Sequence, residues 1–200
     1  MSSIDICNLA LAHIGDESNV TSIAPPDGSV QAAHCSRFYP IALSQILERH
    51  AWSFATTRIS LALTGTAPSE WDYQYAYPTN CVKVLKILPY EGTSDDITEE
   101  FQVESLADGT RVIMTNTELA TCRYILNVTD TSKFTPAFTV AFSWLLASYL
   151  AGPITKDLAK KESTYKVFLI ELGTAAKLDA NSGNRDPRVH FTPSSIQARR

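Results

Sequence analysis

The sequence predicts an α+β fold in which helices from the two ends of the chain form a bundle around an inserted antiparallel β meander. Apolar residues recur at three- and four-residue intervals over 1–50 and 135–180, which is typical of helices. Over 51–130 apolar residues alternate with small or polar ones, and turn signals separate the runs, as in strands. Residues 185–200 contain two prolines and no periodicity. We therefore expect one domain over 1–184, followed by an extended C-terminal arm over 185–200.

Two helices are expected in the first fifty residues. The apolar spacing predicts a helix over 3–14, and Gly15 is a natural C-terminal stop. A loop rich in proline and glycine follows. Either Asp27 or Ser29 can cap a second helix that runs to about His50.

The β-rich region begins as the chain leaves the second helix in an extended segment over 51–63. Asp108-Gly109 is a strong hairpin signal later in this region. The other expected strands are an aromatic run at 71–77 and the segments 81–88, 101–105, 110–115 and 121–128.

Two further helices are expected over 136–151 and from a cap at Thr155 to about residue 180. No charged residue occurs over 135–155, which is long enough to span a bilayer. We interpret this segment as a buried central helix, because it contains hydroxyl side chains and ends at Gly152-Pro153. In the last helix an apolar stripe is expected from Leu158, Tyr165, Phe168, Leu169, Leu172 and Ala176.

The composition argues against several classes of function. A formal charge of −4 is unsuited to a protein that coats DNA by neutralising its phosphates. The four cysteines are widely spaced and the four histidines lack metal-binding spacing, so no metal or cofactor is expected. The sequence has neither a phosphate-binding loop nor a nucleophile elbow, and we expect no catalytic residues. The N-terminus has no basic segment ahead of an apolar run, so no signal peptide is expected.

Four aromatic residues fall on every second position of one predicted strand: Trp71, Tyr73, Tyr75 and Tyr77. They would share one face of an extended strand. A base-stacking platform would need interleaved cations, but Asp72, Gln74 and Ala76 alternate with them. Packing within the fold and a subunit interface are the remaining interpretations.

Two charged segments are candidate contact regions. The polar stretch 91–100 carries Asp95, Asp96, Glu99 and Glu100, which indicate a solvated acidic loop rather than a calcium loop, because the ligand order and glycine are missing. The segment 185–200 is basic and is either a frayed terminus or an arm that orders on a partner. Its candidate docking residues are Arg185, Arg188, His190, Phe191, Ile196, Arg199 and Arg200.

Three motifs follow one another along the chain. The first is the helix Ile6–Gly15. The second is the aromatic helix exit Arg49–Ala55. The third is the aromatic strand, proline and apolar strand of Trp71–Ile87. Together they resemble tail tubular protein A and related head–tail adaptors of bacteriophages, whose chains open with a similar Asn-x-Ala-Leu-x-x-Ile-Gly helix. The similarity covers about residues 4–90, and beyond them only the order of elements matches.

The resemblance implies a structural virion protein of the neck or tail, assembled in the host cytoplasm, with no enzymatic activity, cofactor or membrane contact. Such proteins form a ring, usually of twelve copies, that joins the capsid portal protein to the tail nozzle or tail tube protein. Genomic DNA passes through the ring without specific binding. Terminal arms and loops make the family's contacts, which would place 185–200 on the portal or a neighbouring subunit, and the acidic loop toward the nozzle or the lumen.

A second hypothesis comes from a different class of function. The chain could be a small cytosolic enzyme or a ligand-binding regulatory protein with an apolar pocket between the sheet and the bundle. It would then be a stable monomer or dimer whose melting temperature rises with ligand.

Overall fold

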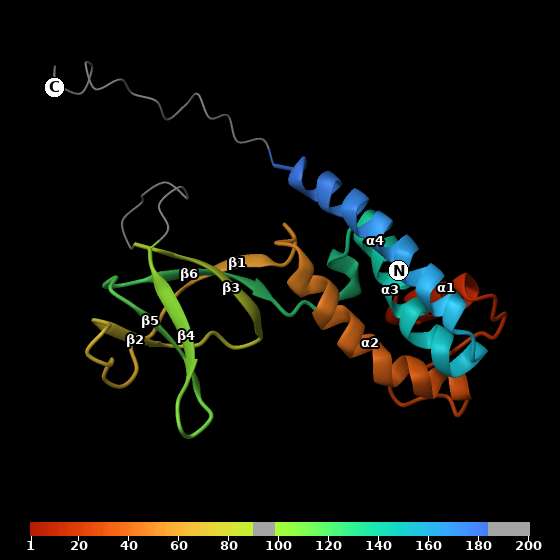
Figure 1. Ribbon diagram of the computed structural model, residues 1–200, viewed down its shortest axis with the longest axis horizontal. Helices are drawn as coiled ribbons and strands as arrows, with labels where there is room; N and C mark the ends of the chain where they lie inside the picture. The colour runs from red at the N-terminus through yellow and green to blue at the C-terminus, as the bar shows by residue number, and fades with distance from the viewer. Residues whose placement is uncertain (90–98, 184–200) are drawn as a thin grey trace, which may run out of the picture.

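The computed structural model describes residues 1–89 and 99–183 and has the α+β fold that the sequence predicts. Figure 1 shows the helices gathered in one half of the molecule and the strands in the other. We call these halves the helical lobe and the barrel. The described helices are α1 (Ser3–His13), α2 (Val30–Arg49), α3 (Pro136–Thr155) and α4 (Leu158–Ala180). The described strands are β1 (Thr56–Ser60), β2 (Tyr73–Ala76), β3 (Cys81–Leu88), β4 (Phe101–Ser105), β5 (Arg111–Thr115) and β6 (Thr121–Leu126).

Helix α3 is the centre of the helical lobe and contacts α1, α2 and α4. Its length and composition alone would allow it to cross a membrane. In the structure most of its side chains, among them Phe138, Phe142 and Leu146, are buried in a core formed by the helices and the aromatic segment after α2. The helices from both ends of the chain therefore pack together, as the apolar patterns predicted.

Local hydrogen bonds define where the helices start. Ser2 and Asp5 form a capping box on α1, and the Ser29 hydroxyl caps α2 by accepting from the amide of Ala32 at 3.1 Å. Asp27 does not cap α2 but accepts from the amide and the hydroxyl of Ser29. The cap therefore falls on the second of the two candidates.

The boundary between α3 and α4 differs from the expectation. α3 continues past Gly152 and Pro153 to Thr155, since a proline in the last turn removes only one helical hydrogen bond. Lys156, at φ 55°, ends α3 in a left-handed conformation. Asp157, not Thr155, caps α4 by accepting from two backbone amides.

The predicted stripe of α4 is partly wrong. Leu158 and Leu169 are 73% and 45% exposed, whereas the most buried residues are Thr164, Phe168 and Ala175. α4 packs mainly on α3, with smaller contacts to Arg49 through Tyr165 and to Ser53 through Asp179, so one narrow face carries most of its burial.

The strands form two three-stranded antiparallel sheets instead of one meander, with the orders β1-β6-β3 and β2-β5-β4. We call the first the proximal sheet, since it adjoins the helical lobe, and the second the distal sheet. Isolated bridges Leu63↔Tyr75 and Ile87↔Glu99 join the sheets at both edges. The two sheets are thereby linked at two points into one small barrel-like unit.

An aromatic cluster joins the helical lobe to the barrel. Trp52 is fully buried just after α2 and donates its indole N–H to the carbonyl of Ile46 at 2.9 Å. Its ring centroid lies 4.9 Å from that of Phe138, which also contacts Phe54 and Phe134. The aromatic exit of the second helix thus forms the junction between the helical lobe and the barrel.

Candidate functional site

The tyrosines of the aromatic run face the interior of the barrel. Tyr75 is 1% exposed, and its hydroxyl donates to the carbonyl of Thr117 at 2.9 Å. Tyr73 and Tyr77 pack against the same core cluster, while Trp71 precedes the strand and is half-buried. Three of the four rings therefore contribute to the packing of the barrel.

The two charged segments lie largely outside the described residues. This applies to Asp95 and Asp96 of the acidic loop and to the whole candidate arm: Arg185, Arg188, His190, Phe191, Ile196, Arg199 and Arg200. Glu99 and Glu100 are described and lead into β4, where the amide of Glu99 donates to the carbonyl of Ile87 at 3.1 Å.

The thiols of the barrel are unsuited to nucleophilic chemistry. Burial raises the pKa of Cys122 to about 12, and burial also raises the pKa of Cys81, whose sulfur lies 3.2 Å from the Tyr77 hydroxyl. Both thiols are protonated near neutral pH. Among the described residues no group of three or more histidine, cysteine or carboxylate side chains could hold a metal ion.

His13 lies in the helical lobe in a structural environment. Its ring stacks on Trp144 with centroids 3.7 Å apart, and its Nε2 lies 3.0 Å from Ser143 Oγ. The Ser143 hydroxyl donates to the carbonyl of Val140, so Nε2 must be the donor to Ser143. Burial lowers the pKa of His13, which favours the neutral ring.

A cluster that the sequence did not suggest connects the end of α4 to the start of the barrel. The Asp179 carboxylate accepts from the Ser53 amide at 3.0 Å and from the Ser53 hydroxyl at 2.6 Å. His50 Nε2 lies 3.3 Å from the same carboxylate, whose side chain is 5% exposed. These are the residue types of a hydrolase triad, but the carboxylate sits between serine and histidine. The serine proton points at the aspartate, so the cluster anchors α4 and does not activate a nucleophile.

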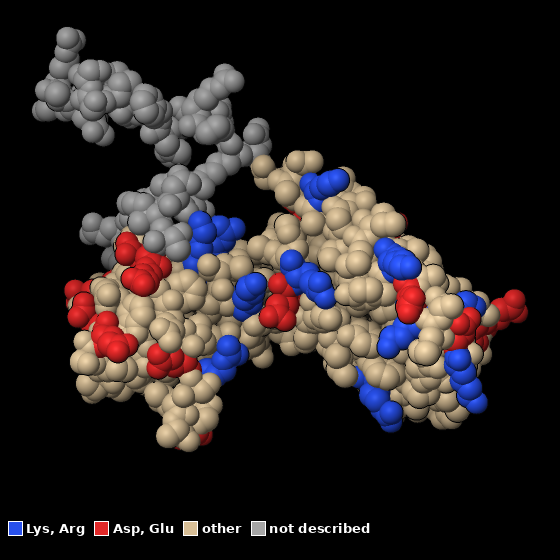
Figure 2. Space-filling model, viewed as in Figure 1, with Lys and Arg blue, Asp and Glu red and all other residues tan. Residues whose placement is uncertain are grey.

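Charge is distributed unevenly over the barrel. On the face shown in Figure 2, carboxylates gather over the end of the barrel farthest from the helices. Lysine and arginine side chains lie nearer to the helical lobe. The uneven distribution marks the barrel surface as a candidate for electrostatic recognition.

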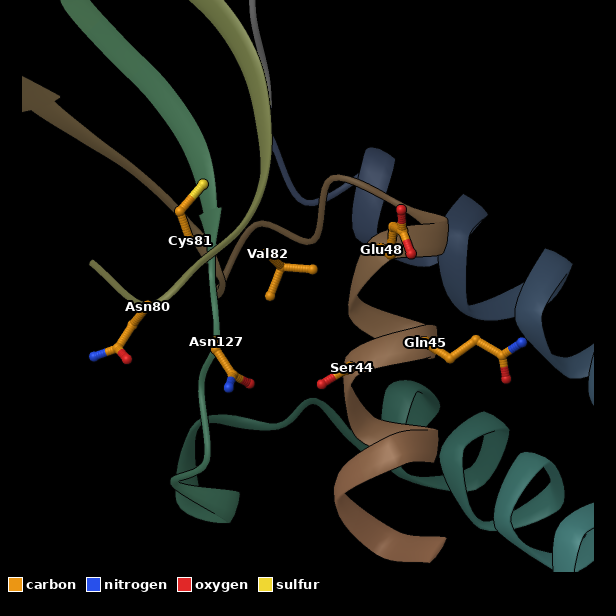
Figure 3. Close-up of a pocket in the computed structure, with 7 residues that line it drawn as sticks. All are labelled: Ser44, Gln45, Glu48, Asn80, Cys81, Val82 and Asn127. Atoms are coloured by element: carbon orange, nitrogen blue, oxygen red, sulfur yellow. The ribbon is translucent and has the colours of Figure 1, made fainter. Parts of the chain in front are cut away.

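A hollow of about 450 Å³ lies between α2 and the barrel (Figure 3). Its lining includes Ser44, Gln45 and Glu48 of α2 and Asn80 and Asn127 of the barrel. In Figure 3 Ser44 and Asn127 point toward each other, whereas Gln45 points away and accepts from the Tyr149 hydroxyl at 2.8 Å. Cys81 and Val82 complete the lining. A pocket therefore exists between sheet and bundle, but polar side chains dominate its wall, and it holds no paired acid and base.

Comparison with protein-family models finds no family that matches the chain, and comparison with curated proteins finds no match.

Proposed function

We propose that the protein is a structural virion protein that forms a ring between the capsid portal and the tail, around the DNA exit channel. The observation that carries the proposal is the succession of three motifs that resemble head–tail adaptors. In the structure they correspond to α1, the aromatic exit of α2, and β2 with β3. The motifs therefore include the junction between the helical lobe and the barrel, and part of the core of the barrel.

The surface of the helical lobe supports contacts between subunits. α4 leaves four large apolar side chains exposed, namely Leu158, Leu169, Ile170 and Leu178. Large apolar groups on an outer helix favour association when they lie near each other. Leu158 and Leu169 lie on one flank of α4 together with the half-buried Tyr165 and Leu172. In the proposed ring this flank packs against a neighbouring copy.

The charge of the chain supports the role of a conduit. The chain is net acidic, so a channel built from it would let DNA slide rather than hold it. In this mechanism the basic segment 185–200 orders on the portal when the filled capsid is closed.

Mass photometry with and without portal rings from the same virus tests the proposal. We expect single subunits, or one large ring, when the protein is alone, and a complex larger than the portal after mixing. A variant that ends at Gly183 should keep the circular dichroism and melting temperature of the full chain and fail to join portal rings. Normal binding by this variant would refute the role of the arm. Absence of any assembly by the full chain would refute the adaptor function.

A ligand-binding protein is the second candidate, and the 450 Å³ hollow between α2 and the barrel favours it. It predicts a monomer or dimer whose size does not change with portal rings. It also predicts a melting temperature that rises in a screen of small metabolites. Gln45→Leu and Asn127→Leu should remove that rise, because both residues line the hollow.

A further inference from the structure

Leu119 combines an exposed side chain with a backbone conformation that leucine rarely adopts. The side chain is 57% exposed, and φ is 51°, in the left-handed region. Among the described residues two other non-glycine residues have positive φ, and both suit their places. Lys156 ends α3 in this conformation, and Asn80 is of a residue type that tolerates it. Leu119 has no such local reason.

The turn between β5 and β6 holds Leu119 in this conformation. From inside the barrel, the Tyr75 hydroxyl donates to the Thr117 carbonyl at 2.9 Å and lies 3.5 Å from the Ala120 amide. Backbone strain persists only where the surrounding structure imposes it, and it concentrates at functional positions. We call residues 116–120 the distal turn. Its exposed leucine is therefore a candidate contact residue.

The distal turn presents this leucine among carboxylates. Glu118 directly precedes Leu119 and is exposed. Asp72 is also exposed, and its amide donates to the Asn116 side chain at 3.0 Å; Glu70 lies two residues before it. Neither the distal turn nor the segment 59–82 contains a lysine or arginine. Such a turn would repel DNA and would fit a surface that combines an apolar recess with a cation.

A hollow of about 280 Å³ near the start of α4 has this complementary character. Its lining consists of Leu158, Lys161, Glu162 and Tyr165. We call it the α4 hollow. The Tyr165 hydroxyl accepts from Arg49 at 3.3 Å, which holds the ring in place as one wall. A leucine of another subunit can pack between Leu158 and Tyr165 while a neighbouring carboxylate meets Lys161.

The charges at the two places are available for such a contact. Neither Glu118 nor Lys161 has an ion pair within the described residues. Glu162 lies one helical turn before Lys166, so two lysines flank the one carboxylate that lines the α4 hollow. The hollow is therefore bordered by a net positive charge, opposite in sign to the distal turn.

The distal turn and the α4 hollow lie at opposite ends of the subunit. β6 runs from the distal turn to the junction with the helical lobe, where the Leu126 amide donates to the Ala55 carbonyl at 2.8 Å. α4 meets the same junction with its last turn, through Asp179 and Ser53, and extends away from the barrel (Figure 1). At 1.5 Å per residue, its hollow lies roughly 25–30 Å beyond that contact. A contact between opposite ends joins copies head to tail, as a ring requires.

We propose that Leu119 of each copy enters the α4 hollow of the next copy, with Glu118 facing Lys161. This inference rests on the proposed ring and names one of its subunit interfaces. A second copy is the occupant that the charges favour, because every copy carries both the acidic turn and the hollow bordered by lysines. The contact also gives a reason for leucine at a position where glycine or asparagine would be less strained. The neighbouring subunit, and not the fold, requires the apolar side chain.

The variant Leu119→Asn separates assembly from stability. Asparagine adopts the left-handed region more easily and cannot fill an apolar hollow. The melting temperature should therefore stay level or rise, while association weakens at least ~10-fold. Mass photometry and sedimentation velocity measure association of the chain alone and with portal rings. Leu106→Asn is the matched control, because Leu106 is an exposed leucine in the turn at the other end of β5 and should leave association unchanged.

Charge reversal tests whether the two ends meet. Glu118→Lys and Lys161→Glu should each weaken association ~10-fold, because each brings like charges together at every contact. The chain that carries both substitutions should recover most of the loss, since every contact again joins opposite charges. Lys133→Glu changes the net charge as Lys161→Glu does but lies between β6 and α3, so it should associate like the native chain.

Three results would overturn the proposed interface. The first is native association by Leu119→Asn, and the second is a double reversal that associates no better than the single ones. The third is a Leu119→Asn chain that self-associates normally and no longer binds portal rings, which would assign the distal turn to the portal. In each case the native chain would still form rings and the adaptor function would stand. If the native chain formed no ring with or without portal, the adaptor function itself would fail, and the interface with it.

Discussion

Replacing Asp179 with alanine should detach the end of α4 from the start of the barrel. Asp179 accepts from the amide and hydroxyl of Ser53, which is 126 residues away in the sequence, and contacts His50 at 3.3 Å. The segment 185–200 begins five residues after α4 ends at Ala180. The proposed arm would therefore leave the subunit from a position that this carboxylate fixes.

The expected loss is about 2–3 kcal/mol. A hydrogen bond to a charged group contributes about 1.5–3 kcal/mol, and two such bonds would be lost. Ser53 is exposed, so water replaces part of each bond, and the total falls below the simple sum. Asp179→Asn keeps an acceptor for one donor and should lose about half as much.

Asp130→Ala is the matched control. Asp130 accepts from the amide and hydroxyl of Ser132 at 3.0 and 2.7 Å, the same donor pair, but only two residues away. That local cap is open to water, so its loss should destabilise the fold less than the loss of Asp179. Urea unfolding followed by circular dichroism gives both values if the m-value is unchanged, and the Asp179→Ala melting temperature should fall by ~4–12 °C. Equal losses for the two variants would refute the anchoring role of Asp179.

Three further variants probe the two lobes. Burial lowers the pKa of His13 below its ordinary value, so the neutral ring stabilises the fold above pH ~6.5. This stabilisation is lost as the pH falls from ~6.5 through the lower pKa of the folded state. The variant His13→Gln should therefore show a smaller change of unfolding free energy with pH over that acidic range. Phe138→Ala should lower the free energy of unfolding in urea by about 3–5 kcal/mol, because the ring is fully buried among four other aromatic rings. A loss near 1 kcal/mol would show instead that the neighbouring side chains move in and fill the cavity. Gly65→Ala should lower the melting temperature more than Gly109→Ala. Both glycines have positive φ, but only at Gly65 would the added Cβ lie close to another group, 2.6 Å from Gln74 Nε2. Equal shifts of the melting temperature would contradict the predicted clash.

Local chemistry explains which elements the sequence could predict. Alternation and turn signals placed β3 at 81–88 and β4 at 101–105, as the structure has them, because side-chain direction and turn conformation depend on near neighbours. Strand partners depend on distant residues. The expected meander paired successive strands, whereas β6 lies between β1 and β3, and nothing in the strand sequences themselves specifies that choice.

The candidate functional clusters are harder still to predict from the sequence, because their members are far apart in the chain. Asp179 has no motif around it, and only the packing of α4 against α3 brings it to Ser53. The part of the sequence that came closest to indicating this cluster was the end of α2, where His50 and Ser53 stand on either side of the buried Trp52. The facing positions of Arg58, Arg123 and Lys86 could not be predicted from spacing either, because these residues come from three strands and align only through the observed register.

The position of the aromatic run changes which residues should carry assembly. Tyr73, Tyr75 and Tyr77 belong to the pattern that resembles head–tail adaptors, yet their rings pack inside the barrel. Substitutions there should destabilise the barrel before they affect any partner. In the proposed ring, contacts between subunits would instead come from side chains that point outward. The resemblance therefore marks how the subunit folds, whereas assembly would depend on residues outside the aromatic run.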